Sequence, residues 1–220
     1  MDNRRIYRTI RMAIKQLFPT EPKGNFARQL TTLAAMVTGI VQARSCQLPA
    51  IARKTPDRVK ADSRIKRYSR WVQNERIEYN GFYLPFVSEL LSHLAAIREL
   101  VFVIDGSEVG QECITLMISL IYGKRALPIT WLVVKGRKGH LSEAIHLDLL
   151  AQLQAILPEN CRVVFLGDGE FDGIALQAAL QTQNWRYVCR TAKNTILYED
   201  GRPFSFAELF LQVDDQICIP

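Results

Sequence analysis

The stretch "VFVIDGSEVG", residues 101–110, decides the fold class of this chain, because an apolar run leads straight into a carboxylate. Four apolar residues precede Asp105, and a glycine and a serine follow it. A short run of this kind, rich in β-branched residues, predicts a buried strand that ends at the aspartate. The stretch "VVFLGDGEFDG", residues 163–173, repeats the pattern around Asp168.

The residues around these two stretches predict an α/β fold. Apolar runs at 100–105, 113–122 and 126–134 read as strands. An amphipathic helix at 142–157, a strand at 162–168, a helix at 173–183 and a strand at 185–191 follow. This order predicts hairpins first and then parallel crossovers, all in one mixed sheet.

The front of the chain predicts helices instead. Residues 4–18, 26–44, 50–55 and 61–76 carry apolar residues at helical spacing. A further helix around 82–97 connects the two halves. We therefore expect a helical domain at 1–77, a connecting helix at 78–99 and a sheet domain at 100–220. Tyr68 and Trp71 could stack on bases, although at this spacing a core position is the more common one.

Charge is distributed unevenly between the two halves. Residues 1–76 hold 17 Lys and Arg against 5 Asp and Glu, whereas residues 77–220 hold 11 against 17. The excess of basic residues in 1–76 predicts a module that binds a polyanion. Several short helices, the last of them basic, are typical of a helix-turn-helix-like protein that binds double-stranded DNA. An ordinary solvated face is the alternative. The candidate DNA-binding residues are Arg44, Arg53, Lys54, Arg64, Lys66, Arg67 and Arg70, with Lys135, Arg137 and Lys138 in a basic loop.

The two aspartates are candidate metal ligands. If their strands pair in parallel, Asp105 and Asp168 lie side by side, and two close carboxylates repel unless a divalent cation sits between them. Mg²⁺ or Mn²⁺ suits such oxygen ligands. The alternative is that each Asp-Gly pair merely forms a turn. An EF-hand loop starting at Asp168 is excluded, because its twelfth position is Ala179. His140 and His146 lack a partner at ligand spacing.

Nothing in the composition indicates a membrane or secreted protein. The longest strongly apolar stretch, "CITLMISLIYG", is about half of the ~20 residues that a membrane span needs. The first 30 residues carry charges throughout, so no secretory signal is visible. Five cysteines without a CxxC pair are typical of reduced thiols. We expect a cytoplasmic protein.

The chain resembles bacterial insertion-sequence transposases of the acidic-triad (DDE) type, in particular the IS-four-like group. The likeness rests on "FVIDGSEVG" and "VFLGDGEFDG", supported by "LTTLAAMVTGIVQARSCQLPAIA" in front. It implies an RNase H-like core in which Asp105 and Asp168 are the first and second metal-binding aspartates. It also implies transposon-end binding by the helical domain, Mg²⁺-dependent strand cleavage and transfer, a homodimer in a synaptic complex, and a location at the bacterial nucleoid.

The family completes its triad with a glutamate, usually in a Tyr-x2-Arg-x3-Glu pattern, and here the chain departs from it. Tyr187 and Arg190 have the first spacing, but Asn194 stands at the required position. The remaining late acids, Glu199, Glu208, Asp214 and Asp215, lie in no convincing helix. We therefore expect a truncated or frameshifted transposase with weak or absent catalysis. A non-catalytic DNA-binding derivative and a nuclease of the same fold are the alternatives.

Overall fold

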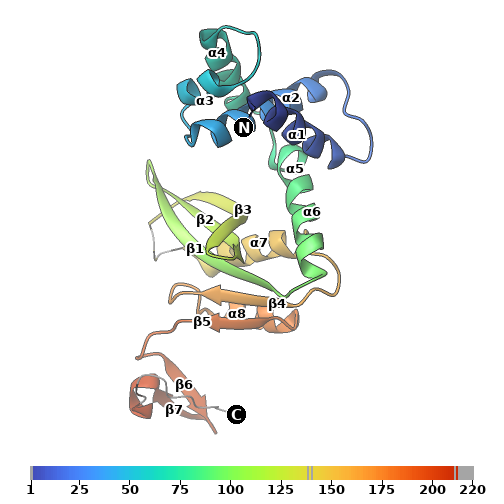
Figure 1. The fold of residues 1–220 in the computed structure, drawn as a ribbon. Helices are drawn as coiled ribbons and strands as arrows, with labels where there is room; N and C mark the ends of the chain where they lie inside the picture. Colours follow the sequence, from blue (N-terminus) through green and yellow to red (C-terminus); the bar gives the residue numbers. More distant parts are fainter. Residues whose placement is uncertain (1, 138, 140, 211, 213–220) are drawn as a thin grey trace. The chain divides into compact units, whose positions relative to one another are not determined.

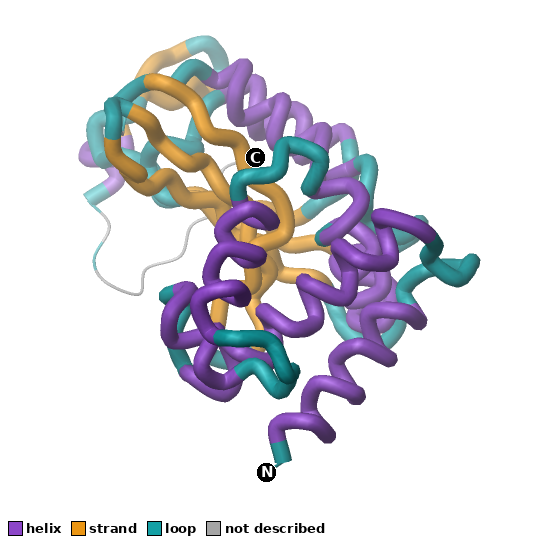
Figure 2. Tube along the Cα trace, turned by 90° about the horizontal axis from the view of Figure 1, so that it is seen from above, coloured by secondary structure: helices purple, strands orange, loops and turns teal. Residues whose placement is uncertain are grey.

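The computed structural model describes residues 2–137, 139, 141–210 and 212, and the chain divides into two compact units. The first, Met1–Leu90, is built from helices, and the second, Leu91–Pro220, holds the strands that the structure describes (Figures 1 and 2). Among the described residues, no helix combines the length and the apolar character that crossing a membrane requires.

The helices of the first unit follow the predicted segments within a few residues. They are α1 (Asn3–Gln16), α2 (Gly24–Ala43), α3 (Leu48–Lys54), α4 (Ala61–Val72), α5 (Tyr79–Phe82) and α6 (Leu84–Ala95), which continues past the unit boundary. α2 and α3 approach closely at Gly39, where a Cβ would lie 2.5 Å from Cγ2 of Ile51. A side chain at position 39 would therefore push the two helices apart.

Two apolar clusters hold this unit together. Tyr68 of α4 is fully buried in the first, beside Ala35, Met36, Ile51 and Ala52. The second is a chain of edge-to-face aromatic pairs with ring centroids 5.3–5.8 Å apart, formed by Phe18, Phe26, Phe82 and Trp71. Both Tyr68 and Trp71 thus have core positions, and the preferred interpretation of these two residues is confirmed.

The second unit is built on a five-stranded mixed sheet. Its strands are β1 (Leu100–Gly110), β2 (Cys113–Tyr122), β3 (Arg125–Lys135), β4 (Val163–Gly167) and β5 (Arg186–Cys189), in the order β3-β2-β1-β4-β5. The first three pair antiparallel, and β4 runs parallel to both β1 and β5. With α7 (Glu143–Gln154) before β4 and α8 (Ile174–Thr182) after it, the predicted order of elements and the α/β class are confirmed.

The two faces of this sheet differ. Side chains alternate along each strand, so Phe102 and Ile104 of β1 point to one face, where they are buried together with Leu116 of β2. α7 and α8 pack on that face (Figure 1). Val103 and Asp105 point to the opposite face, with Met117 beside Asp105 in the register and Trp131 beside Met117. Val103, Met117 and Trp131 are half-buried there, and Asp105 is exposed.

The predicted end of the first strand was wrong. β1 does not stop at Asp105 but continues to Gly110, because its antiparallel pairing with β2 extends to the pair Gly110 and Cys113. Gln111 and Glu112, with φ of 51° and 57°, then form the hairpin turn. What ends near Asp105 is the parallel ladder with β4, whose last pair is Val103 and Leu166.

Beyond β5 the chain forms a small hairpin that the sequence analysis did not predict. It consists of β6 (Ile196–Glu199) and β7 (Arg202–Ser205), followed by the 3₁₀ helix η1 (Phe206–Leu209). Tyr187 lies on β5, and Asn194 lies in the turn before β6. The incomplete Tyr-x2-Arg pattern therefore does not fall on a helix.

Candidate functional sites

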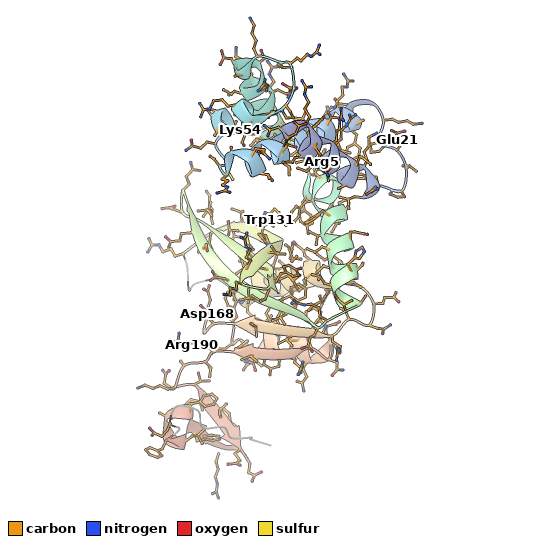
Figure 3. The ribbon with its side chains drawn as sticks, in the orientation of Figure 1. Arg5, Glu21, Lys54, Trp131, Asp168 and Arg190 are labelled. Carbon is orange, nitrogen blue, oxygen red and sulfur yellow. The ribbon has the colours of Figure 1, made fainter. Side chains whose placement is uncertain are left out.

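The second unit brings its two predicted metal ligands to one hollow. Asp105 and Asp168 both line a concavity of about 590 Å³, together with Val103, Ser107 and Met117. The register explains this proximity, since Val103 pairs with Leu166 and each aspartate lies two residues further along its own chain. Both aspartates are exposed. Asp168 and Arg190 follow the neighbouring strands β4 and β5 at the same edge of the sheet (Figure 3).

A tight turn fixes the position of Asp168. Its carboxylate oxygen Oδ1 accepts the backbone N–H of Glu170 at 3.0 Å, and its carbonyl accepts the N–H of Phe171, also at 3.0 Å. Gly167 allows this turn to close, because a Cβ there would lie 2.8 Å from Cβ of Phe171. Asp168 therefore does form a turn, as the alternative interpretation expected, and the same turn places it at the hollow.

Glu143 anchors the segment that follows the turn. Its Oε1 accepts the N–H of Leu176 at 2.8 Å, in the first turn of α8, where Gly173 offers no capping side chain. A Cβ on Gly173 would lie 2.2 Å from that oxygen, so the glycine leaves the room that Glu143 fills. The first residue of α7 thus holds the start of α8 and the loop that carries Asp168.

His146 lies beneath this loop and not in the hollow. His146 is 3% exposed, and the centroid of its ring is 4.9 Å from that of Phe171. Burial lowers the pKa of His146, and the charges of Glu170 and Glu143 oppose that shift. Nε2 of His146 and Oε1 of Glu170 are buried without a hydrogen-bond partner among the described residues. The position agrees with a structural histidine. His140 lies outside the described residues.

The donor set at the hollow fits a hard divalent cation held by two side chains. Carboxylate oxygens suit Mg²⁺ and Mn²⁺, and Mg²⁺ commonly binds through one or two carboxylates while it keeps several waters. Within the described part of the chain, no group of three or more His, Cys, Asp or Glu residues is arranged to hold a metal. Glu199 ends β6, and Glu208 accepts hydrogen bonds from Ser205. Asp214 and Asp215 lie outside the described residues.

The predicted DNA-binding residues of the first unit divide into two groups. One group is exposed to solvent: Arg44 directly after α2, Arg53 and Lys54 in the last turn of α3, and Lys66 and Arg70 on α4. The other group, Arg64 and Arg67, faces the loop between α3 and α4. The exposed group can reach phosphates directly.

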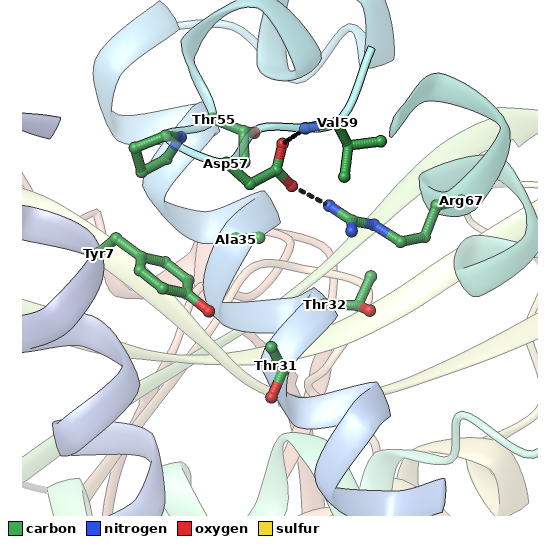
Figure 4. Close-up of a pocket in the computed structure, with 9 residues that line it drawn as sticks. Tyr7, Thr31, Thr32, Ala35, Thr55, Asp57, Val59 and Arg67 are labelled. Atoms are coloured by element: carbon green, nitrogen blue, oxygen red, sulfur yellow. Dashed lines mark hydrogen bonds and ion pairs between the residues drawn. The ribbon is translucent and has the colours of Figure 1, made fainter. Parts of the chain in front are cut away.

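Asp57 holds the second group in place. Its carboxylate lies 2.6 Å from Nε of Arg64. It also lies 2.7 Å from Nη2 of Arg67 and accepts the N–H of Val59 at 3.1 Å (Figure 4). Arg64 also donates to the backbone carbonyls of Ala52 and Asp57, and its side chain is only 13% exposed. Sequence reasoning missed the role of Asp57, since no local pattern marks an aspartate that pairs with residues seven and ten positions later.

The same network borders a small cavity of about 200 Å³. Tyr7 of α1, Thr31 and Thr32 of α2, and Thr55 line it beside Asp57 and Arg67 (Figure 4). The hydroxyl groups of Thr55 and Tyr68 are 2.7 Å apart and share a buried hydrogen bond. These contacts join α4 to the α3–α4 loop, so the orientation of the basic helix is determined by the core of the unit.

The basic loop of the second unit is described only in part. Lys135 ends β3 and is exposed, as is Arg137, whereas Lys138 lies outside the described residues. Neither Lys135 nor Arg137 forms an ion pair with another residue that the structure describes.

Comparison with known proteins adds no assignment. No model of a known protein family matches this chain, and no curated protein matches it. Its function must therefore be argued from its own residues.

Proposed function

We propose that this chain is a DNA-binding protein of the DDE transposase type. Its first unit binds transposon-end DNA, and its second unit is an RNase H-like core that holds Mg²⁺ or Mn²⁺ between Asp105 and Asp168. The observation that carries the proposal is the shared hollow, which two aspartates far apart in the sequence both line because β1 pairs with β4. The central position of β1, with β4 beside it, supports the RNase H-like assignment.

The residues of the chain would contribute to phosphodiester chemistry as follows. Asp105 lies on the central strand β1, and Asp168 lies in a turn that its own carboxylate closes by a hydrogen bond, so the backbone of the sheet and of the turn positions both residues. A bound divalent ion would activate a water or a DNA 3′-hydroxyl and stabilise the leaving oxygen. Arg190, exposed after β5 at the same edge, can neutralise a phosphate there.

A second candidate function is a DNA-binding derivative that does not cleave DNA. It is favoured by Asn194, which lies in a turn where the family pattern has a glutamate on a helix. With two carboxylates, a second metal ion lacks a ligand, and a loss of about 10³-fold in rate corresponds to only ~4 kcal/mol. Such a protein would occupy transposon ends or inhibit an intact enzyme.

Binding of Mn²⁺ to the full chain separates these candidates. Electron paramagnetic resonance, which detects free Mn²⁺, should show that the wild-type chain binds Mn²⁺ at one site. Asp105→Asn and Asp168→Asn should each abolish this binding. Glu108→Gln is the matched control, because Glu108 is exposed on β1 but does not line the hollow. Nicking of supercoiled plasmid in Mg²⁺ or Mn²⁺ should be lost in both Asn variants.

Retention of Mn²⁺ binding by both Asn variants would exclude the metal site. A wild-type chain that binds duplex DNA but neither binds Mn²⁺ nor nicks plasmid would establish the non-catalytic candidate.

A further inference from the structure

A second set of cations lies on α1, outside the residues assigned to DNA binding above. Arg4, Arg5, Arg8 and Arg11 are all exposed. Arg4, Arg8 and Arg11 follow one another at intervals of four and three residues, so they share one face of the helix. At a rise of 1.5 Å per residue, this stripe extends about 10 Å along the helix axis.

The beginning of α1 adjoins the end of α3. Nδ2 of Asn3 donates a hydrogen bond to the backbone carbonyl of Lys54, at 3.0 Å. Arg53 and Lys54 are exposed in that last turn of α3, close to the first turn of α1 (Figure 3 labels Arg5 and Lys54). We call Arg4, Arg5, Arg8, Arg53 and Lys54 the α1–α3 basic surface.

The charges of the arginines on α1 are unfavourable for the stability of this helix. The N-cap carboxylate of Asp2 accepts the N–H of Arg4 and favours the helix, but the first turn itself contains no acidic residue, and the cations there oppose the helix dipole. Arg4 and Arg8 lie four residues apart, and Arg5 and Arg8 three, so their charges repel across adjacent turns. Lys15, at the other end of α1, is instead paired with Glu21 at 2.8 Å. The exposed arginines at the start of α1 thus outnumber the single N-cap carboxylate, which leaves a cationic surface suited to an external anion.

We propose that Arg4, Arg5 and Arg8 extend the DNA-binding residues already assigned on α3, so that the α1–α3 basic surface contacts the backbone of duplex DNA in addition to the exposed residues of α4. The inference rests on the proposed function, because it assigns a further contact surface to the same DNA-binding unit. Five cations from two adjoining helix ends suit a polymer with regularly spaced phosphates, whereas a small anion would contact only one or two of them.

The test is the salt dependence of binding to a random-sequence duplex, measured by fluorescence anisotropy with the full chain. The variant is Arg4→Gln, Arg5→Gln, Arg8→Gln, since glutamine removes charge and keeps a good helix propensity. Three lost phosphate contacts should reduce the slope of log K against log salt by about 2.7, and weaken binding at low salt by about tenfold or more. Lys15→Gln, on the same helix but paired within the chain, should leave the slope unchanged.

A thermal unfolding measurement accompanies the titration. The triple variant should unfold at the wild-type temperature or above it, because repulsion within α1 is relieved. A lower unfolding temperature would show that the arginines stabilise the fold, and would overturn the inference.

The inference and the proposed function fail in different ways. If the triple variant keeps the wild-type slope while Lys66→Gln with Arg70→Gln reduces it, the α1–α3 basic surface is not a DNA contact and the proposed function stands. If the wild-type chain itself shows a flat salt response, DNA binding by the first unit is wrong, and the inference falls with it.

Discussion

Replacing Asp57 with alanine should destabilise the first unit strongly, although Asp57 lies in a loop. The substitution removes the carboxylate that pairs with Arg64 and Arg67 and accepts the N–H of Val59. The Arg64 side chain is 13% exposed and the Asp57 side chain 29%, so water replaces this partner poorly. The pair with Arg67, whose side chain is 38% exposed, should contribute less.

The expected magnitude follows from these contacts. The hydrogen bond from the N–H of Val59 to the charged carboxylate contributes about 1.5–3 kcal/mol, and each of the two partly exposed ion pairs about 0.2–1 kcal/mol. Arg64 keeps its carbonyl acceptors, so we expect a total loss of about 3 kcal/mol in the free energy of unfolding. For a unit of this size, that loss lowers the midpoint of unfolding by on the order of 10–20 °C.

Calorimetry of the full chain, with hydrogen exchange of peptides from residues 61–72, would locate the effect. Exchange in α4 should accelerate in Asp57→Ala and remain at the wild-type rate in Glu75→Ala, which removes an exposed acid from the same unit. The same midpoint and the same exchange rates in both variants would refute a structural role for Asp57. Arg64 and Arg67 would then be ordinary surface cations.

Two further predictions concern the second unit. Glu143→Ala should lower the free energy of unfolding by about 1 kcal/mol, because the N–H of Leu176 loses its acceptor. Glu143→Gln keeps an acceptor oxygen and should lower it less. Equal losses of both variants in denaturant titrations would contradict the capping role. Because the pKa of His146 is lowered in the folded state, the unfolded chain takes up the proton first. The free energy of unfolding should therefore fall as pH drops below about 6.5, and less steeply in His146→Gln. An unchanged pH profile in that variant would exclude His146 as the cause.

The order of strands and helices could be predicted because it depends on local periodicity. The β-branched run of β2 and the apolar stripe of α7 are visible without knowledge of their partners. The length of β1 could not be predicted in the same way, since residues 106–110, Gly-Ser-Glu-Val-Gly, contain two glycines and only one apolar side chain. They are strand residues because β2 pairs with them, which is a contact between distant segments. Asp200 and Gly201 did mark the missed hairpin, as a turn dipeptide between two short strands.

The basic residues of α4 also depend on a contact between separate segments that the sequence does not reveal. In the sequence, Arg64 and Arg67 are indistinguishable from Lys66 and Arg70, since all four are cations on one helix. Their roles separate only when the α3–α4 loop brings Asp57 against one side of α4. Composition therefore predicted a cationic unit, but it could not predict which cations belong to the fold.

The two proposed sites share one physical signature. Asp105 and Asp168 bring like charges to a single hollow, and the arginines at the start of α1 bring like charges to a single helix end. The like charges at each site repel one another, although the Asp168 carboxylate also closes its own turn by a hydrogen bond. A divalent cation removes the cost at the first site, and the DNA backbone removes it at the second. Neutral substitutions should therefore weaken ligand binding at each site more than they weaken the fold, whereas a structural charge such as Asp57 should show the opposite order of effects.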